Sequence, residues 1–114
     1  MHSPSEHTVN GKHYDVELHI VHHYKGTDDQ LGAVIAIFFD VGVSSPSYRN
    51  NDLLDSIFKI VDNVDDNYSG TVRLQQFLQN VDFSSYWNYN GSQTTPPCQE
   101  GMKWTVIKDV QEIS

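Results

Sequence analysis

The run Leu31–Val41 (LGAVIAIFFDV) constrains the fold of this chain more than any other segment. It is almost continuously apolar, and its β-branched and aromatic residues favour a strand that is buried on both faces. Such a strand needs one layer of structure above it and another below it. A length of 114 residues allows one domain at most. Two covering layers are a heavy demand on so short a chain, and we therefore expect a piece of a larger domain.

Two further segments alternate between apolar and polar residues and predict strands. Residues 102–108 (MKWTVIK) predict a closing strand, and residues 14–24 (YDVELHIVHHY) predict an earlier one. In the earlier strand the even positions are expected to face the core, and the odd positions form a polar face that suits solvent or a lined cavity. The even positions are Val16, Leu18, Ile20 and His22, and the odd ones are Asp15, Glu17, His19, Val21 and His23.

The remaining patterns are weaker. Apolar residues at helical spacing predict short helices at 51–61 and 74–81, with an acidic turn or loop at 62–70 between them. An aromatic patch follows, and it is more typical of a core than of a binding site: Phe83, Tyr86, Trp87 and Tyr89. Together the elements predict an α+β fold that is predominantly β.

Composition excludes several classes of partner. The chain has 7 Lys and Arg residues against 15 Asp and Glu residues, a formal net charge of -8. Nucleic acids and anionic membranes attract basic patches, so we expect neither as a partner. No apolar run reaches the length needed to span a membrane. No cleavable signal is recognisable, because Met1 is followed by a histidine and Ser-Pro; if the protein is secreted, its signal lies outside this sequence.

Histidine and cysteine are distributed unevenly. All six histidines fall in the first 23 residues, a weak indication of metal or proton chemistry. The only cysteine, Cys98, cannot form an internal disulfide. It is a buried thiol, which is the default for a lone cysteine, a reactive thiol, or half of a bridge to a cysteine outside this chain.

Three stretches together carry a resemblance to a known family. They are HSPSEHTVNGKHYDVELHIVH (residues 2–22), AVIAIFFDVG (33–42) and YWNYNGSQTTPPCQEGMKWTVIK (86–108). In this order and spacing they resemble the zinc-ligand region, the central strand and the active-site loop of the α-class carbonic anhydrases. The resemblance implies a central twisted, mixed, mostly antiparallel sheet with short peripheral helices. It also implies that residues 1–114 form a single partial domain, with the family's N-terminal and C-terminal parts outside this chain.

The resemblance implies a Zn²⁺ site. Family members carry a His-x-His pair and a third histidine on the next strand. His2 matches the second member of the pair and His19 matches the third ligand, while the first ligand would lie immediately before Met1. Three neutral imidazoles leave zinc its double charge, so a water in the fourth position ionises near pH 7 in carbonic anhydrase. The implied activity is reversible hydration of carbon dioxide to bicarbonate and a proton through zinc-bound hydroxide.

Other site residues are assigned by the same resemblance. Thr94 matches the family's gatekeeper threonine and Glu6 its carboxylate partner; if Glu6 accepts the hydroxyl proton, Thr94 can only accept from the zinc-bound group. Glu17 matches the carboxylate that supports a zinc ligand. His7 and Tyr89 match structural residues near the site. The substrate pocket corresponds to Val21, Val34, Gln93, Thr95, Met102 and Trp104.

The residues alone leave alternatives open. His19 also fits a surface histidine on a half-exposed strand, "TTPP" fits a merely ordered loop, and the apolar pocket residues fit ordinary core. Gln93 stands where the family usually has leucine, so one pocket wall becomes polar. Cys98 matches a position that is bridged in secreted members, and this implies a secreted, extracellular or periplasmic protein.

A second function remains possible because the first zinc ligand is not in this chain. The chain could be a catalytically inactive carbonic anhydrase-like module that binds or assembles with other proteins. Another chain could then complete the fold by covering its exposed strand edges.

Overall fold

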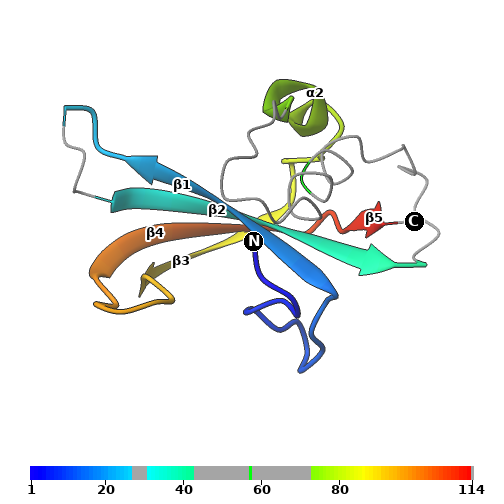
Figure 1. Cartoon of the computed structure of the whole chain (residues 1–114), viewed down its shortest axis with the longest axis horizontal. Helices are drawn as coiled ribbons and strands as arrows, with labels where there is room; N and C mark the ends of the chain where they lie inside the picture. The colour runs from blue at the N-terminus through cyan, green and yellow to red at the C-terminus, as the bar shows by residue number, and fades with distance from the viewer. Residues whose placement is uncertain (27–30, 43–56, 58–72, 114) are drawn as a thin grey trace, which may run out of the picture.

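The computed structural model describes residues 1–26, 31–42, 57 and 73–113. In this part of the chain the main element is one five-stranded sheet, accompanied by a short helix (Figure 1). The strands are β1 (Val16–His23), β2 (Leu31–Val41), β3 (Tyr86–Ser92), β4 (Glu100–Ile107) and β5 (Gln111–Ile113), and the helix is α2 (Leu74–Leu78). The helix predicted at 51–61 and the acidic loop predicted at 62–70 lie outside the described residues, apart from Ile57.

The sheet is mixed, as the sequence predicts. The strand order is β1-β2-β4-β3, and β5 pairs with β2 further along. β1 is antiparallel to β2, and β3 is antiparallel to β4, whereas β4 and β5 both run parallel to β2. The two antiparallel ladders are the longer ones.

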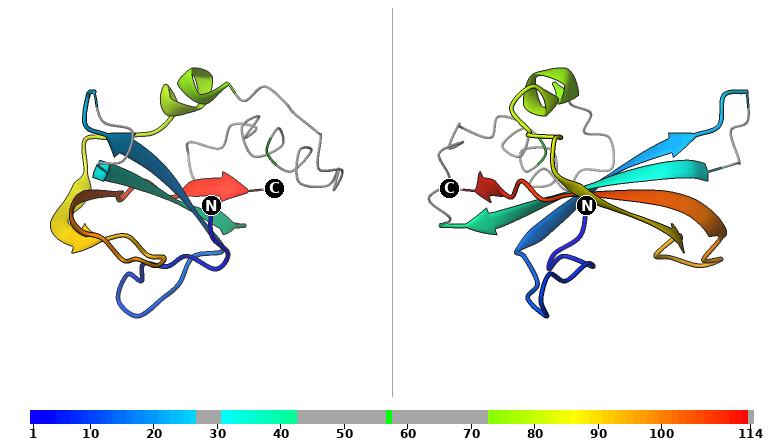
Figure 2. Two further views of the ribbon diagram at one scale, coloured as in Figure 1. Left: turned by 60° about the vertical axis from the view of Figure 1, so that its left-hand side comes forward. Right: turned by 180° about the vertical axis from the view of Figure 1, so that it is seen from behind.

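β2 is covered on both faces, which confirms the expectation drawn from its apolar sequence. Its two sets of side chains belong to two separate clusters on opposite faces of the sheet. The cluster on the helix side contains Val16, Ile37, Phe39, Phe77, Val81 and Ile107. The cluster on the other face contains Val34, Ala36, Phe38, Met102, Trp104 and Val106. Figure 2 shows α2 on one side of the sheet and the N-terminal segment on the other, so we call these the helix face and the N-terminal face.

β1 divides its side chains between these faces as its alternation predicts. Val16 is buried in the helix-face cluster, and Leu18 and Ile20 pack against it. Glu17 and His19 instead lie opposite Phe38 and Ala36 of β2, which places them on the N-terminal face. A buried cluster and a set of ionisable groups are thus held on opposite sides of one strand.

The aromatic patch is not core, and this part of the prediction is wrong. Tyr86, Trp87 and Tyr89 are 49%, 42% and 43% exposed. They belong to β3, which ends the sheet in the described part of the chain and pairs there only with β4. The Nζ atom of Lys108 lies 4.6 Å from the centre of the Trp87 ring, a cation–π contact.

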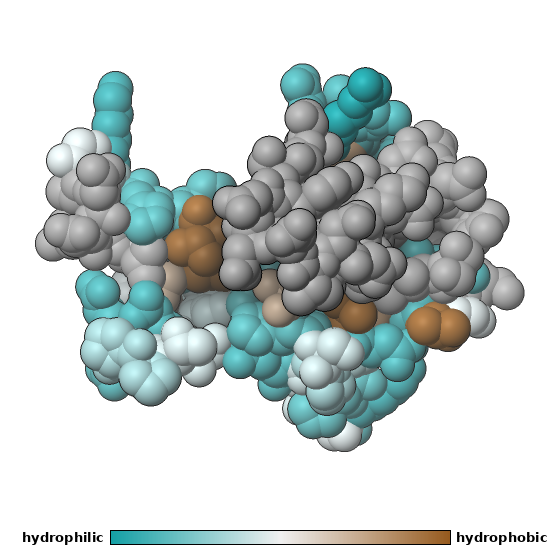
Figure 3. Space-filling model, in the orientation of Figure 1, coloured by the Kyte–Doolittle hydropathy of each residue, from teal (hydrophilic) through white to brown (hydrophobic). Residues whose placement is uncertain are grey.

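The described part of the face that Figure 3 shows is mostly polar. In Figure 3 the described residues are largely hydrophilic, with apolar surface in only a few places. None of the helices in the described ranges is long and apolar enough to cross a membrane.

Candidate metal centre

The N-terminal segment folds back beneath the sheet through a tight hairpin. Val9 and Lys12 exchange two backbone hydrogen bonds of 3.0 Å across Asn10 and Gly11. Both central residues have positive φ, 52° and 79°. This conformation suits the Asn-Gly dipeptide, because glycine has no Cβ to clash in the left-handed region and asparagine tolerates that region better than most residues. The hairpin directs the chain back toward β1.

Ser5 fixes the segment just before this hairpin. It is 2% exposed, and its hydroxyl donates to the backbone oxygen of His7 at 2.7 Å. The same hydroxyl accepts from the backbone N–H of Tyr14 at 2.9 Å. These bonds hold the backbone on either side of Glu6, so the carboxylate of Glu6 projects from an ordered turn.

His2 is placed next to His19 by main-chain pairing. The backbone N–H groups of His2 and Glu17 each donate to the other's oxygen at 2.9 Å, so residue 2 pairs with β1 through an isolated antiparallel bridge. The imidazole rings of His2 and His19 then lie 4.7 Å apart between centroids. The two histidines predicted to bind zinc are therefore neighbours.

Glu6 completes a cluster of three possible ligands. Its Oε2 lies 3.5 Å from Nε2 of His2 and 3.8 Å from Nδ1 of His19. The ligand atoms of His2, Glu6 and His19 all lie within 4.8 Å of one another. Ligands of a tetrahedral zinc at 2.0–2.1 Å are separated by about 3.3 Å, close to these spacings. Two imidazoles and a carboxylate are also donors that zinc accepts, so this cluster fits the metal.

A second group, His7, Glu17 and His19, also has ligand atoms within 4.8 Å. It fits a hydrogen-bond network better than a metal. Oε1 of Glu17 accepts from Nδ1 of His7 at 2.5 Å and from Nε2 of His19 at 2.8 Å. Oε2 accepts from the backbone N–H of His7 at 2.9 Å, and Nε2 of His7 is 2.5 Å from the hydroxyl of Tyr89. The nitrogen of His19 that faces Glu17 is therefore engaged, and Nδ1 is left toward the first cluster.

Glu17 is a fully buried carboxylate that stays ionised. Burial is the largest single influence and raises its pKa. Hydrogen bonds from the rings of His19 and His7 and from the backbone of His7 lower the pKa and together outweigh burial, so it falls well below its usual range. The negative charge of Glu17 is thus available to orient His19 at neutral pH.

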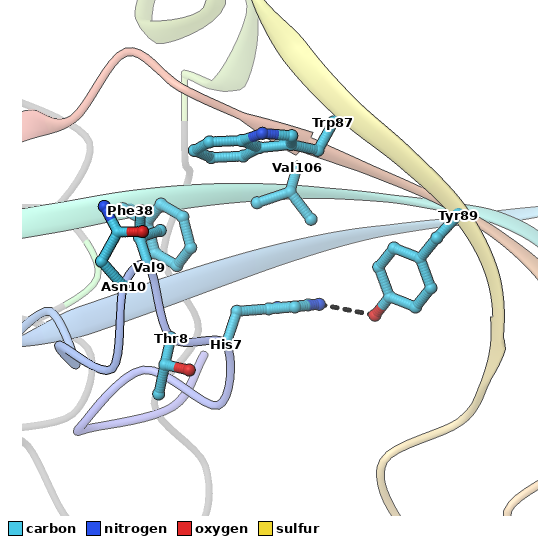
Figure 4. A pocket seen from close by; sticks show the side chains of 8 residues that line it. All are labelled: His7, Thr8, Val9, Asn10, Phe38, Trp87, Tyr89 and Val106. Carbon is cyan, nitrogen blue, oxygen red and sulfur yellow. Dashed lines mark hydrogen bonds between the residues drawn. The ribbon is translucent and has the colours of Figure 1, made fainter.

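The ring of Trp104 contacts the rings of His7 and His19. Its ring centre lies 5.0 Å from that of His7 and 4.9 Å from that of His19, both in edge-on contacts. The Tyr89 ring is stacked on it at 6.0 Å. Gly91 leaves room for this stack, because a Cβ there would lie 2.7 Å from Tyr89 and 3.1 Å from Trp104. Figure 4 shows the His7 ring directed at the Tyr89 hydroxyl, beside an open pocket of about 330 Å³.

The predicted pocket residues divide by position. Val34, Met102 and Trp104 are almost fully buried in the N-terminal-face cluster. Val21 is 46% exposed at the end of β1, and Gln93 is half-buried.

The loop after β3 carries Thr94, the residue matched to the gatekeeper threonine. Thr94 and Thr95 are exposed, and among the described residues Thr94 makes no hydrogen bond to Glu6. The loop is closed instead by its own backbone, through Gln93 N–H to the Gln99 oxygen at 2.9 Å and Cys98 N–H to the Thr95 oxygen at 2.8 Å. Cys98 is exposed, so its default interpretation as a buried thiol is wrong. The predicted bridge to a cysteine outside the chain stays a prediction.

Sequence reasoning missed the residues that shape the N-terminal segment. Ser5 has no sequence signal of its own that separates it from a surface serine. Asn10-Gly11 between two residues that pair is a recognised hairpin signal and could have placed this turn.

Comparisons with known proteins match this chain to one family. A family model described as eukaryotic-type carbonic anhydrase matches residues 1–114. Dioscorin DB3L of Dioscorea polystachya is 42% identical over 114 residues, covering 99% of this chain and 40% of the relative. Alpha carbonic anhydrase 3 of Arabidopsis thaliana is 38% identical over 114 residues, covering 99% of this chain and 39% of the relative.

Solved structures share the fold. A fungal alpha carbonic anhydrase from Aspergillus oryzae superposes with a TM-score of 0.77 at 30% identity, covering 98% of this chain and 47% of that one. A dioscorin complexed with ascorbate superposes with a TM-score of 0.75 at 34% identity, covering 99% of this chain and 45% of that one. The chain spans about 40% of the length of the curated relatives it matches. The family match over residues 1–114 and the shared fold show that this chain belongs to the eukaryotic-type carbonic anhydrase family.

Proposed function

We propose that this chain contributes His2 and His19 to the zinc site of a carbonic anhydrase domain that interconverts carbon dioxide and bicarbonate. The observation that carries the proposal is the meeting of His2 Nε2 and His19 Nδ1 beside Glu6, with the other nitrogen of His19 occupied by Glu17. A ligand whose far nitrogen donates to a carboxylate is fixed in tautomer and orientation, as metal-binding histidines usually are.

Zinc in such a site supplies a Lewis acid that lowers the pKa of a bound water toward neutrality. The chain's own residues supply ligand atoms for the metal, the orientation of one ligand and an apolar surface for the substrate. His2 and His19 present nitrogen lone pairs, and Glu17 stabilises the orientation of His19. Trp104, Val34 and Met102 form an apolar wall next to His19, which suits a nonpolar substrate that offers little to hydrogen-bond.

We propose that Glu6 and Thr94 together fix the direction of the hydrogen bond between Thr94 and the reacting group. Glu6 is held near both histidines by the turn around Ser5. Thr94 sits in a loop closed by its own backbone hydrogen bonds and bounded by β3 and β4. We propose that Thr94 donates to Glu6 in the active domain and so accepts from the reacting group.

The experiment is zinc loading followed by carbon dioxide hydration, on the protein that contains this chain. We expect zinc to bind in a one-to-one ratio, and we expect His2→Ala and His19→Ala to lose both zinc and hydration activity. The matched control is His23→Ala, because His23 is exposed at the end of the same strand as His19. Unchanged zinc content in His19→Ala would disprove the ligand assignment. Stoichiometric zinc without hydration activity would favour the catalytically inactive module.

A further inference from the structure

We propose that Asn90 is a site of N-linked glycosylation and that the attached glycan shields the open, uncharged edge of β3. The site is separate from the candidate metal centre, and the proposal does not depend on zinc binding.

Asn90-Gly91-Ser92 has the acceptor pattern for N-linked glycans, which is Asn-x-Ser or Asn-x-Thr with any residue except proline in the middle. The sequence contains this pattern twice, at residues 67–69 and at residues 90–92. The first instance lies outside the described residues. Because so short a pattern also occurs by chance, it marks a glycan only where the asparagine side chain is exposed to solvent.

The side chain of Asn90 meets this condition. It is exposed, and within the described part of the chain it makes no hydrogen bond or ion pair. The other asparagine on this side of β3 is engaged, since Oδ1 of Asn88 accepts a hydrogen bond from the hydroxyl of Thr105 at 2.9 Å. Asn90 also helps to line an open recess of about 300 Å³, so a sugar attached to its Nδ2 has room beside the sheet.

Asn90 lies on the opposite face of the sheet from the candidate metal centre. Its neighbour Tyr89 is on the N-terminal face, where the tyrosine ring stacks on Trp104. Side chains alternate along a strand, so Asn90 is on the helix face, opposite Lys103 of β4. The arrowhead of β3 also lies away from α2 (Figure 1). A glycan on Asn90 therefore obstructs neither the histidines nor the described helix.

The outer edge of β3 carries backbone groups without partners in the described part of the chain. The backbone oxygen of Ser85 accepts from the N–H of Lys108 at 3.0 Å, so the backbone groups of residue 85 face β4. The direction alternates along an antiparallel ladder, so Tyr86, Asn88 and Asn90 direct their N–H and C=O groups away from β4. No other described strand pairs with this edge. An edge of this kind is a template for pairing with another chain.

The usual protection of an edge strand is absent from β3. Charged side chains and proline are the common means of preventing edge-to-edge pairing, and β3 has neither. Residues 83–99 contain no Asp, Glu, Lys or Arg, the longest such run in a chain of net charge -8. The exposed aromatic residues of this run are Phe83, Tyr86, Trp87 and Tyr89. A glycan is bulky and solubilising, so on Asn90 it supplies the missing protection.

The attachment forms one bond and breaks one. Nδ2 of Asn90 bonds to C1 of the first sugar of an oligosaccharide that is carried on a lipid pyrophosphate. The bond between C1 and the pyrophosphate oxygen breaks, the lipid pyrophosphate leaves, and Nδ2 releases one proton. This reaction belongs to the secretory pathway, and the match of Cys98 to a bridged position also predicts a secreted protein.

The first measurement is peptide mapping of the protein that contains this chain, purified from its natural source. Trypsin separates the two acceptor patterns because Arg73 lies between them, and Asn90 falls in peptide 74–103. We expect this peptide to carry a glycan, and we expect peptide N-glycosidase in ¹⁸O-water to leave a labelled aspartate at position 90. A digest without the glycosidase is the control, because an Asn-Gly pair also deamidates spontaneously.

Four variants secreted by eukaryotic cells separate the acceptor pattern from other effects of substitution. Asn90→Gln and Ser92→Ala each remove the pattern, and we expect both to lose the mass of one whole glycan. Ser92→Thr preserves the pattern and should keep the glycan. Asn88→Gln should also keep it, because Asn88 is an exposed asparagine of the same strand outside either pattern.

The second measurement tests the shielding on folded protein. An Asn67→Gln background leaves Asn90 as the only acceptor, so the glycosidase removes one glycan without changing any step of folding. We expect the deglycosylated protein to associate at lower concentration than the untreated protein, as measured by light scattering. We expect its zinc content to stay the same, because Asn90 faces away from the histidine cluster.

An unmodified peptide 74–103 in the natural protein overturns the proposal, as does a natural protein that is confined to the cytosol. A glycan on Asn90 whose removal leaves association unchanged overturns the shielding role. Loss of zinc on deglycosylation contradicts the separation of Asn90 from the metal centre, whereas a protein that never binds zinc counts only against the proposed function.

Discussion

Replacing Gly91 by alanine tests the packing that supports the histidine network. A Cβ at this position would lie 2.7 Å from Cε2 of Tyr89 and 3.1 and 3.3 Å from two ring atoms of Trp104. Overpacking of this kind costs about 1–3 kcal/mol. Alanine gains about 0.5–1 kcal/mol over glycine inside a strand, because the unfolded chain loses less freedom. The net expectation is a loss of about 1–2 kcal/mol in the free energy of unfolding.

Gly32→Ala is the matched control, since Gly32 also lies within a strand of the same sheet. The three heavy atoms nearest to its Cβ would all belong to the ring of Tyr24, at 3.2–3.4 Å, and that side chain is 54% exposed. We expect Gly32→Ala to be within about 0.5 kcal/mol of the wild type.

Urea unfolding followed by far-ultraviolet circular dichroism measures both variants. Tryptophan fluorescence is avoided because Trp104 is itself displaced. If Gly91→Ala is as stable as Gly32→Ala, the stack of Tyr89 on Trp104 is looser than the structure shows and the reasoning fails.

Three other predictions follow from the described contacts. Phe39→Ala should cost about 3–5 kcal/mol in urea unfolding, because Phe39 is fully buried and stacked on Phe77; a loss under 1 kcal/mol would contradict its place in the core. Ser5→Ala should cost about 1 kcal/mol, because it leaves the partly buried N–H of Tyr14 without its acceptor; a neutral result would contradict the role of the Ser5 hydroxyl in holding this turn. The pKa of Asp40 is lowered chiefly by its hydrogen bond with Lys12, so its contribution is present above the ordinary pKa of an aspartate and is lost as pH falls through the lowered folded value. Stability measured against pH should therefore fall less steeply below about pH 4 in Asp40→Asn than in the wild type, and identical slopes would refute this.

The central strand and the divided faces of β1 were predictable because their patterns are strong. An apolar run such as Leu31–Val41 has few ways to avoid water other than burial on both sides, and the structure buries it so. The alternation in β1 fixes which side chains share a face, so Glu17 and His19 had to lie together once the strand formed.

The exposure of β3 was not predictable from composition. Aromatic residues are usually buried, but whether a strand lies at the centre or at the end of a sheet depends on pairing partners far away in the sequence. The sequence therefore predicts Trp87 and Tyr89 as core residues, whereas both are partly exposed in the structure. The link from Tyr89 to His7 has the same origin, because it joins residues 82 positions apart.

The order of the site residues along the chain has a consequence for the timing of assembly. His2, Glu6, Glu17 and His19 come from the first 19 residues and meet through a hairpin and one strand, so little loop entropy opposes their approach. Tyr89 and Trp104 arrive only when distant strands dock. During synthesis, the residues proposed to hold zinc would therefore emerge from the ribosome long before the aromatic residues that pack around them.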